Sequence, residues 1–289
     1  MCDESTAVAE DAALARAGLS RRRFAMMGAT AALAACSGSG KADGPSLGES
    51  MVRITTPDGT ADAFFVHPAA GKHPGVILWP DIGGLRDAFK AMARRLAGAG
   101  YAVLAVNQYY RSAPAPVLAS FSEWRTPDGQ AKLKPMIAAV TPEGTMRDGA
   151  AFARWLDGQA AVDTARKLGS QGYCMGGPHA VRTAAAAADR VGAVGSMHGG
   201  QLVGTDPQSP INLIARTKAS FLFAIGQNDD QKSPGDKDAL RQAAAAAGRP
   251  AEIEVYPADH GWCVPDTPMY NQVQADRAWT RLLALYGKL

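Results

Sequence analysis

The chain has 289 residues, of which 47% are hydrophobic and 20% are charged. This balance is typical of a globular protein and excludes a disordered chain. The formal net charge of +3 is too small an excess to indicate a nucleic-acid-binding protein. Four cysteines are too few for a disulfide scaffold, and none forms a C-x-x-C pair, which excludes a zinc ribbon. Since the sequence contains no H-E-x-x-H or other close ligand set, we expect neither a catalytic metal nor a cofactor.

The first 36 residues resemble an export signal. The residues S-R-R-R-F at 20–24 open a moderately apolar stretch that suits a signal h-region but is too short to span a bilayer. This arrangement resembles a twin-arginine signal, and the L-A-A-C that ends it resembles a lipobox with Cys36 as the lipidated residue. The alternative is an amphipathic helix with an incidental buried cysteine. We expect an exported, periplasmic protein, lipid-anchored at Cys36, with a flexible tether over residues 37–50.

From residue 51 onward, apolar runs alternate with helical periodicities. The turn at Pro57–Gly59 predicts a hairpin between a strand around Ile54 and a strand at 61–66. Later runs predict the strands 75–79, 102–106, 168–173, 191–195, 221–225 and 253–256. Apolar spacings of three and four predict the helices 89–98, 143–156, 178–188, 236–247 and 270–285.

This alternation predicts one α/β domain over residues 51–289, a mostly parallel central sheet with helices on both faces. Residues 112–141 contain four prolines and little periodicity, so we expect an irregular insertion over the sheet edge there.

A reactive cysteine is predicted between a strand and a helix. The residues G-Y-C-M-G-G at 172–177 have the G-x-nucleophile-x-G spacing of a nucleophile elbow, with Cys174 where serine is more common. The glycines let strand and helix approach around a strained nucleophile, and the helix N-terminus favours a thiolate. The alternative is that Cys174 is a small buried residue in a tight turn.

A cysteine nucleophile needs a base. In α/β-hydrolases the chain order is nucleophile, acid and then histidine. His260 follows the strand at 253–256 and precedes the last helix, so it is the predicted base. His179 lies within the helix after the elbow and is expected to face the sheet or solvent. His198 is expected near the cavity, but its place in the chain does not fit the order of nucleophile, acid and histidine.

The carboxylate that orients the base is expected after the strand at 221–225. The residues G-Q-N-D-D at 226–230 offer Asp229 and Asp230. Only one of them needs to face the imidazole. Asp229 is the predicted acid, and Asp230 is the alternative.

The chain from about residue 51 to residue 289 resembles the dienelactone hydrolase family of α/β-hydrolases. The motifs that carry the resemblance, besides G-Y-C-M-G-G, are the G-x-x-D at 226–229, D-H-G-W at 259–262, W-P-D-I-G-G at 79–84 and N-Q-Y-Y-R at 107–111. The resemblance implies an α/β-hydrolase fold and a hydrolase that cleaves a small carboxylic ester or lactone. It assigns the nucleophile to Cys174, the acid to Asp229 and the base to His260.

The resemblance also implies the groups around the substrate. The family's oxyanion hole corresponds to the backbone N–H groups of Met175 and Ile82, and a carboxylate near the resting cysteine corresponds to Asp81. Of two arginines that hold a substrate carboxylate in the family, Arg111 matches the first, and Val264 stands at the second. The substrate is therefore expected to be anionic, but it need not be a dienelactone.

Several further residues have two interpretations. Aromatic residues are predicted to line the cavity, with ordinary core packing as the alternative: Tyr109, Tyr110, Trp124 and Trp262. Cys263 is predicted to be a buried free cysteine, with a disulfide to Cys174 as the alternative. For the whole protein, the alternatives to ester hydrolysis are a binding lipoprotein without turnover, and a thioesterase or acyl transferase.

Overall fold

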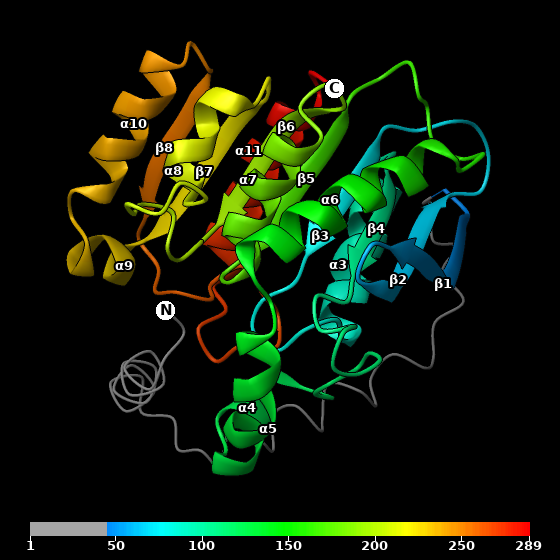
Figure 1. Ribbon diagram of the computed structural model, residues 1–289, viewed down its shortest axis with the longest axis horizontal. Coiled ribbons are helices and arrows are strands. Elements are labelled where there is room, and N and C mark those ends of the chain that lie inside the picture. Colours follow the sequence, from blue (N-terminus) through cyan, green and yellow to red (C-terminus); the bar gives the residue numbers. More distant parts are fainter. Residues whose placement is uncertain (1–44) are drawn as a thin grey trace.

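The computed structural model describes residues 45–289 (Figure 1). The predicted twin-arginine signal and Cys36 lie outside the described residues. Within residues 45–289, no helix combines the length and the apolar character needed to cross a membrane.

The centre of the fold is an eight-stranded sheet with the strand order β1-β2-β4-β3-β5-β6-β7-β8. The strands β1 (Leu47–Thr56) and β2 (Gly59–Pro68) form the predicted antiparallel hairpin, and β2 pairs antiparallel with β4. The other pairs are parallel. Their strands are β3 (Gly75–Trp79), β4 (Ala102–Val106), β5 (Leu168–Tyr173), β6 (Val191–Met197), β7 (Ser220–Gly226) and β8 (Ala251–Tyr256). The predicted mostly parallel sheet is confirmed; residues 47–50, expected in the tether, belong to β1 instead.

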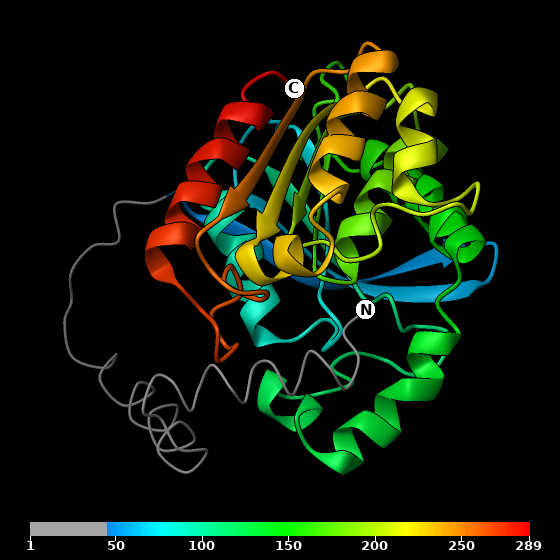
Figure 2. The same cartoon turned by 90° about the vertical axis from the view of Figure 1, so that its left-hand side faces the viewer.

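Helices cover both faces of this sheet, as the side view in Figure 2 shows. The helices α3 (Asp87–Gly98) and α11 (Gln272–Tyr286) pack on one face. The other face carries α6 (Pro142–Asp157), α7 (Gly176–Ala186), α8 (Pro210–Leu213) and α10 (Asp236–Ala246). Every predicted helix is present, with ends shifted by a few residues. The short α9 (Gln227–Lys232), directly after β7, was not predicted.

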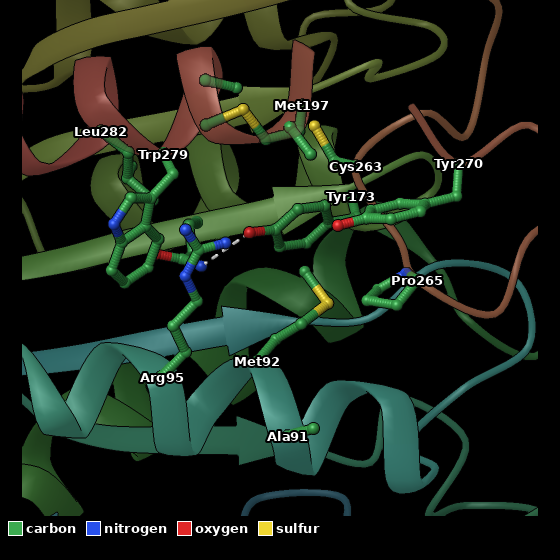
Figure 3. A pocket seen from close by; sticks show the side chains of 13 residues that line it. Ala91, Met92, Arg95, Tyr173, Met197, Cys263, Pro265, Tyr270, Trp279 and Leu282 are labelled. Atoms are coloured by element: carbon green, nitrogen blue, oxygen red, sulfur yellow. Dashed lines mark hydrogen bonds between the residues drawn. The ribbon is translucent and has the colours of Figure 1, made fainter. Parts of the chain in front are cut away.

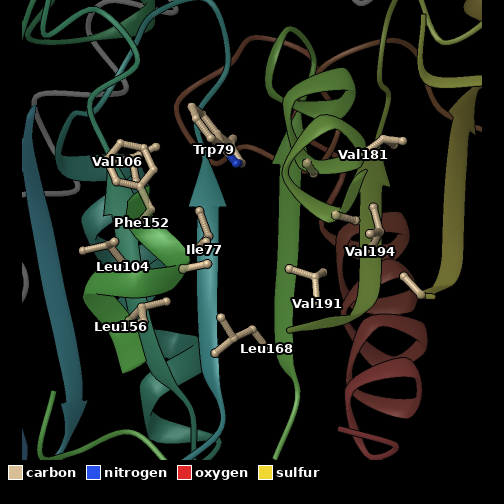
Figure 4. Packing of buried hydrophobic residues seen from close by; sticks show 14 of the residues in the cluster. Ile77, Trp79, Leu104, Val106, Phe152, Leu156, Leu168, Val181, Val191 and Val194 are labelled. Carbon is tan, nitrogen blue, oxygen red and sulfur yellow. The ribbon is translucent and has the colours of Figure 1, made fainter. Parts of the chain in front are cut away.

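The core explains why the central strands read as continuous apolar runs. All five residues of β3 and of β4 are buried, because each strand has helices above and below it. Figure 4 shows Ile77 and Trp79 packed toward Phe152 and Leu156 of α6. Each fully buried side chain of this size stabilises the fold by about 1.5–3 kcal/mol.

The insertion at 112–141 is helical, which corrects the expectation of an irregular segment. It contains α4 (Phe121–Trp124) and α5 (Pro127–Ala138). The hydroxyl of Thr126 accepts a hydrogen bond from the N–H of Gly129 at 3.0 Å, and Pro127 occupies the first turn, where a proline is tolerated. Figures 1 and 2 both place α4 and α5 beyond the carboxyl ends of the parallel strands rather than along a sheet edge.

Candidate active site

Cys174 occupies a strained turn between β5 and α7. Its φ angle is +52°, in the left-handed region that residues with a side chain rarely adopt. A Cβ atom on Gly172 would lie 1.8 Å from the carbonyl oxygen of Gly176, and one on Gly176 would lie 2.4 Å from that of Trp79. The two glycines are therefore required for strand, turn and helix to pass this closely. The backbone N–H of Cys174 donates to the carbonyl of Met197 at 3.0 Å, which ties the turn to β6.

His260 and Asp229 form a hydrogen-bonded pair. The Nδ1 atom of His260 lies 2.8 Å from Oδ2 of Asp229. The His260 backbone N–H donates to Oδ1 of Asn228 at 2.9 Å, so the loop after β8 is held against the start of α9. Asp230 instead accepts two hydrogen bonds from Nζ of Lys237, at 2.7 and 2.9 Å. The carboxylate that faces the imidazole is thus the one predicted.

A cavity of about 270 Å³ brings Cys174, His260 and Asp229 together. It lies at the carboxyl end of the sheet, where open α/β sheets bind their ligands. The remaining wall residues are Ile82, Ile137, Val140, Pro142, Met175, Pro178, His179, Arg182, Gly200 and Gln201. The insertion contributes Ile137 and Val140, so α5 and the segment after it form part of the enclosure.

Two backbone amides adjoin this cavity from different loops. Met175 and Ile82 both line it, and neither backbone N–H donates a hydrogen bond within residues 45–289. The loop of Ile82 is fixed, because the hydroxyl of Tyr109 donates to the Ile82 carbonyl at 2.8 Å and Nε2 of Gln108 donates to the Asp81 carbonyl at 2.7 Å. Such fixed donors suit the stabilisation of an oxyanion.

The model of the dienelactone hydrolase family matches residues 61–289, which is more than half of the chain. The chain belongs to the dienelactone hydrolase family. It is therefore a hydrolase of the type that acts on a carboxylic ester or lactone.

Individual relatives of this hydrolase extend over most of its length. A protein from Methylorubrum extorquens named "Putative carboxymethylenebutenolidase" is 30% identical over 237 residues, which cover 80% of this chain and 78% of the relative. The solved structure named "Putative Dienelactone Hydrolase" from Klebsiella pneumoniae has a TM-score of 0.72 at 24% identity, covering 84% of this chain and all of that chain. The dienelactone hydrolase-like promiscuous phosphotriesterase P91, from metagenomic libraries, has a TM-score of 0.69 at 23% identity, covering 84% of this chain and 98% of that chain. The two structures share the fold.

Asp81 of this dienelactone hydrolase family member lies in a buried ion-pair network, and the structure does not place its carboxylate among the cavity walls. Its Oδ1 accepts from Nη1 of Arg86 at 2.7 Å and from the N–H of Gly83 at 2.8 Å. Arg86 also binds Asp266 at 2.7 Å, and these two carboxylates offset the burial of its guanidinium and hold its pKa above the ordinary value. Asp81 therefore fixes the loop that carries Ile82, which corrects the expectation that its side chain faces Cys174.

Arg111 is also placed differently from the expectation. Its guanidinium binds Asp148 at 2.8 Å and Asp58 at 2.6 Å, away from the walls of the cavity. Hydrogen bonds from Arg147 and Arg111 lower the pKa of Asp58 to about 2. Arg111 therefore belongs to an ion-pair network that holds the structure together, and its position does not support a contact with the substrate.

The predicted pocket aromatics pack in the core instead, because none belongs to the walls of the cavity within residues 45–289. Trp262 is fully buried and stacks on Tyr256, with ring centroids 5.2 Å apart. Tyr109 and Trp124 pack with Ile82 in the cluster that joins the insertion to the sheet. The hydroxyl of Tyr110 donates to Asp148 at 2.7 Å.

Two histidines near the site have roles that the sequence did not reveal. His198 packs against the imidazole of His260, with ring centroids 4.7 Å apart, and burial lowers the pKa of His198 well below its ordinary value. His179 was expected to face the sheet or solvent but lines the cavity, as does Arg182 one turn later. The signal available in the sequence was the spacing 175, 178, 179 and 182, which places these residues on one face of α7.

Cys263 is a buried free cysteine, as predicted. It lines a second, mainly apolar cavity of about 200 Å³ between α3 and α11, shown in Figure 3 with Met92, Tyr173 and Trp279. Burial raises the pKa of the Cys263 thiol well above its ordinary value, which keeps it neutral and unreactive. Among residues 45–289, no group of three or more His, Cys, Asp or Glu residues is arranged to hold a metal ion.

Proposed function

We propose that the protein hydrolyses a carboxylic ester or lactone with Cys174 as nucleophile, His260 as general base and Asp229 as the acid that orients it. The observation that carries the proposal is the 2.8 Å hydrogen bond between His260 and Asp229, at a cavity whose wall includes Cys174. The positive φ angle of Cys174 supports it further, because such strain is typical of an elbow nucleophile. The names of the curated relatives, which denote a lactone-cleaving enzyme, support the substrate class.

In the acylation half of the reaction, His260 accepts the thiol proton and the sulfur of Cys174 attacks the carbonyl carbon. The carbonyl oxygen becomes an oxyanion that receives hydrogen bonds from the N–H groups of Met175 and Ile82. One such donor contributes about 3 kcal/mol to the transition state. The carbon–oxygen bond to the leaving group then breaks, and His260 gives its proton to the departing alkoxide, which leaves a thioester on Cys174.

In the deacylation half, His260 accepts a proton from water as the water oxygen attacks the thioester carbonyl. The same two amides stabilise the second oxyanion. The carbon–sulfur bond breaks, the proton returns to the sulfur, and the carboxylic acid is released. Asp229 remains ionised throughout and stabilises the imidazolium that forms in each half.

The test is turnover of p-nitrophenyl acetate, in buffer with a phosphine reductant, by the wild-type protein and by Cys174→Ala. We expect Cys174→Ala to lose turnover while its circular dichroism spectrum and urea midpoint stay those of the wild type. The matched control is Cys263→Ala, which removes the other cysteine of residues 45–289 and is expected to retain turnover. Undiminished hydrolysis by Cys174→Ala would refute the proposed nucleophile.

We also propose that the enzyme is exported to the periplasm and lipid-anchored through Cys36. The order of S-R-R-R-F and L-A-A-C within residues 20–36 supports this location. Metabolic labelling with a palmitate analogue tests it: label is expected on the wild-type chain and not on Cys36→Ala. An unlabelled, cytosolic wild-type chain would contradict the proposal.

A further inference from the structure

One face of α7 forms a wall of the catalytic cavity. Met175, Pro178, His179 and Arg182 all line it, at the spacing that places residues on one side of a helix. Side chains on a helix lean toward its N-terminus, so Arg182 leans toward the end of α7 that holds Cys174. From Gly176 to Arg182 the helix rises about 9 Å, at about 1.5 Å per residue. A group bound by Arg182 would therefore lie several bonds away from the carbonyl that Cys174 attacks.

Arg182 is buried without a carboxylate partner. Only 9% of the residue is exposed, and no Asp or Glu within residues 45–289 forms an ion pair with it. Its Nε donates to the backbone carbonyl of Gln208 at 3.2 Å, and its Nη2 group donates no hydrogen bond within that range. Burial lowers the pKa of Arg182, whereas Asp206 and Glu143 raise it from a distance.

The other two inward-facing arginines near the site are satisfied. Arg86 and Arg111 each bind two carboxylates. The two acidic residues that raise the pKa of Arg182 are held by Gln208 instead: Glu143 accepts from the Gln208 side chain at 2.7 Å and Asp206 from the Gln208 backbone N–H at 2.7 Å. A buried guanidinium without a counter-charge is unfavourable unless a ligand supplies the charge.

His179 adds a second donor to the same wall. Nη1 of Arg182 lies 3.4 Å from Nδ1 of His179, and because a guanidinium only donates, Nδ1 accepts. Burial lowers the pKa of His179 to about 3, so the ring is neutral and carries its single proton on Nε2. That Nε2 is buried and has no hydrogen-bond partner within residues 45–289. This wall therefore offers N–H donors in excess of the acceptors around them.

We infer that Arg182, assisted by His179, binds a carboxylate of the substrate, so that the enzyme selects esters or lactones that carry a negative charge several bonds from the cleaved carbonyl. The inference rests on the proposed function and assigns the recognition of the anion to α7, not to Arg111. It predicts a preference that depends on the distance between the carboxylate and the reacting carbonyl.

The experiment compares matched substrates in the wild-type enzyme. The anionic set is the mono-p-nitrophenyl esters of succinic, glutaric and adipic acid, and the neutral set is the p-nitrophenyl esters of the monocarboxylic acids of equal chain length. We expect kcat/KM for at least one anionic ester to exceed that of its neutral partner by about 10- to 100-fold, which is the fold-change that one charge-assisted hydrogen bond to the substrate would give. Equal values at every length would overturn the inference.

Three variants then locate the site. Arg182→Met should remove the anion preference, because KM for the anionic esters rises by much more than KM for the neutral esters, and Arg182→Lys should retain part of the preference. The exposed Arg154 of α6 provides the control, since Arg154→Met should keep the preference in full. Loss of the preference in Arg111→Met, with Arg182→Met unaffected, would contradict the assignment to α7.

Inhibition of the wild type keeps the test decisive if Arg182→Met fails to fold. Pentanoate is expected to inhibit at least 10-fold more tightly than pentanamide, and equal inhibition would count against the inference. The two proposals fail differently. Turnover of neutral esters by Cys174→Ala refutes the proposed function, whereas Cys174-dependent turnover without an anion preference refutes only the inference.

Discussion

The imidazole of His260 donates from Nδ1 to Asp229, at 2.8 Å, although Asp230 is the next residue in the chain. Asp230 points to Lys237 instead, and the two aspartates therefore form a matched pair for mutagenesis. Asp229→Asn is expected to lower kcat by roughly 10²- to 10⁴-fold, because the amide cannot stabilise the imidazolium. The kcat of Asp230→Asn is expected to stay within about twofold of the wild-type value, because Asp230 is paired with Lys237 and not with the imidazole. Steady-state kinetics with p-nitrophenyl acetate measures kcat for both variants. Equal losses of kcat in the two variants would contradict the assignment of the acid.

The elbow makes a prediction about stability. Gly172→Ala would place a Cβ atom 1.8 Å from the Gly176 carbonyl oxygen, so strand β5 and helix α7 would have to separate. We expect a loss of at least about 4 kcal/mol in the free energy of unfolding, or no folded protein. Gly98→Ala is the control, since a Cβ there meets no atom within 4 Å. It should stabilise α3 by about 0.5–1 kcal/mol. Urea unfolding measures both, and a folded Gly172→Ala of wild-type stability would contradict the geometry of the turn.

The network around Arg86 predicts a coupled loss of stability and activity. Arg86→Met leaves Asp81 buried and unpaired, which costs about 3–5 kcal/mol. Because Asp81 fixes the loop of Ile82, kcat should also fall while thiol labelling of Cys174 persists. The exposed pair Lys218–Asp189 is the comparison, and Lys218→Met should change stability little. An Arg86→Met protein with unchanged unfolding and unchanged kcat would show that the network does not support the oxyanion loop.

The buried histidines predict how stability depends on pH. Burial lowers the pKa of His179 to about 3, whereas an unfolded histidine titrates near 6.5. Below about pH 6.5 the unfolded chain therefore binds a proton that the folded chain excludes, so stability is complete above that pH and declines as the pH falls toward 3. From pH 7.5 to pH 5.0 the loss from His179 is about 2 kcal/mol. Urea unfolding should show that His179→Gln loses about that much less than the wild type over this interval. Parallel pH curves would contradict the burial of a neutral His179.

The sequence predicted the sheet and the elements that carry the chemistry, because these depend on short-range patterns. A strand buried on both faces reads as an unbroken apolar run, as in β3 and β4. The elbow needs glycine at fixed positions around Cys174, so six consecutive residues determine its geometry. The acid and the base follow two strands whose order in the chain is set by the fold.

What the sequence did not predict depends on long-range partners. The family resemblance assigned Arg111 to the substrate and Asp81 to the neighbourhood of the resting cysteine. Arg111 is instead held by Asp148, 37 residues away, and Asp81 by Arg86, which itself binds Asp266, 180 residues away. Prolines suggested an irregular insertion, whereas Thr126 and Pro127 begin a helix. The spacing in the sequence places Arg182 on one helix face with Met175 and His179, but an arginine in a helix is usually exposed, and only the fold shows that this face is buried at the cavity.

In the proposed mechanism, acyl groups pass through the sulfur of Cys174. Its most direct test is mass spectrometry of the reduced enzyme, quenched with acid seconds after mixing with p-nitrophenyl acetate and then digested. We expect an added acetyl group on the peptide that contains Cys174, and neutral hydroxylamine should remove this group, as it does from a thioester. Acetylation confined to another residue, or hydrolysis at full rate with the Cys174 sulfur never acylated, would contradict it.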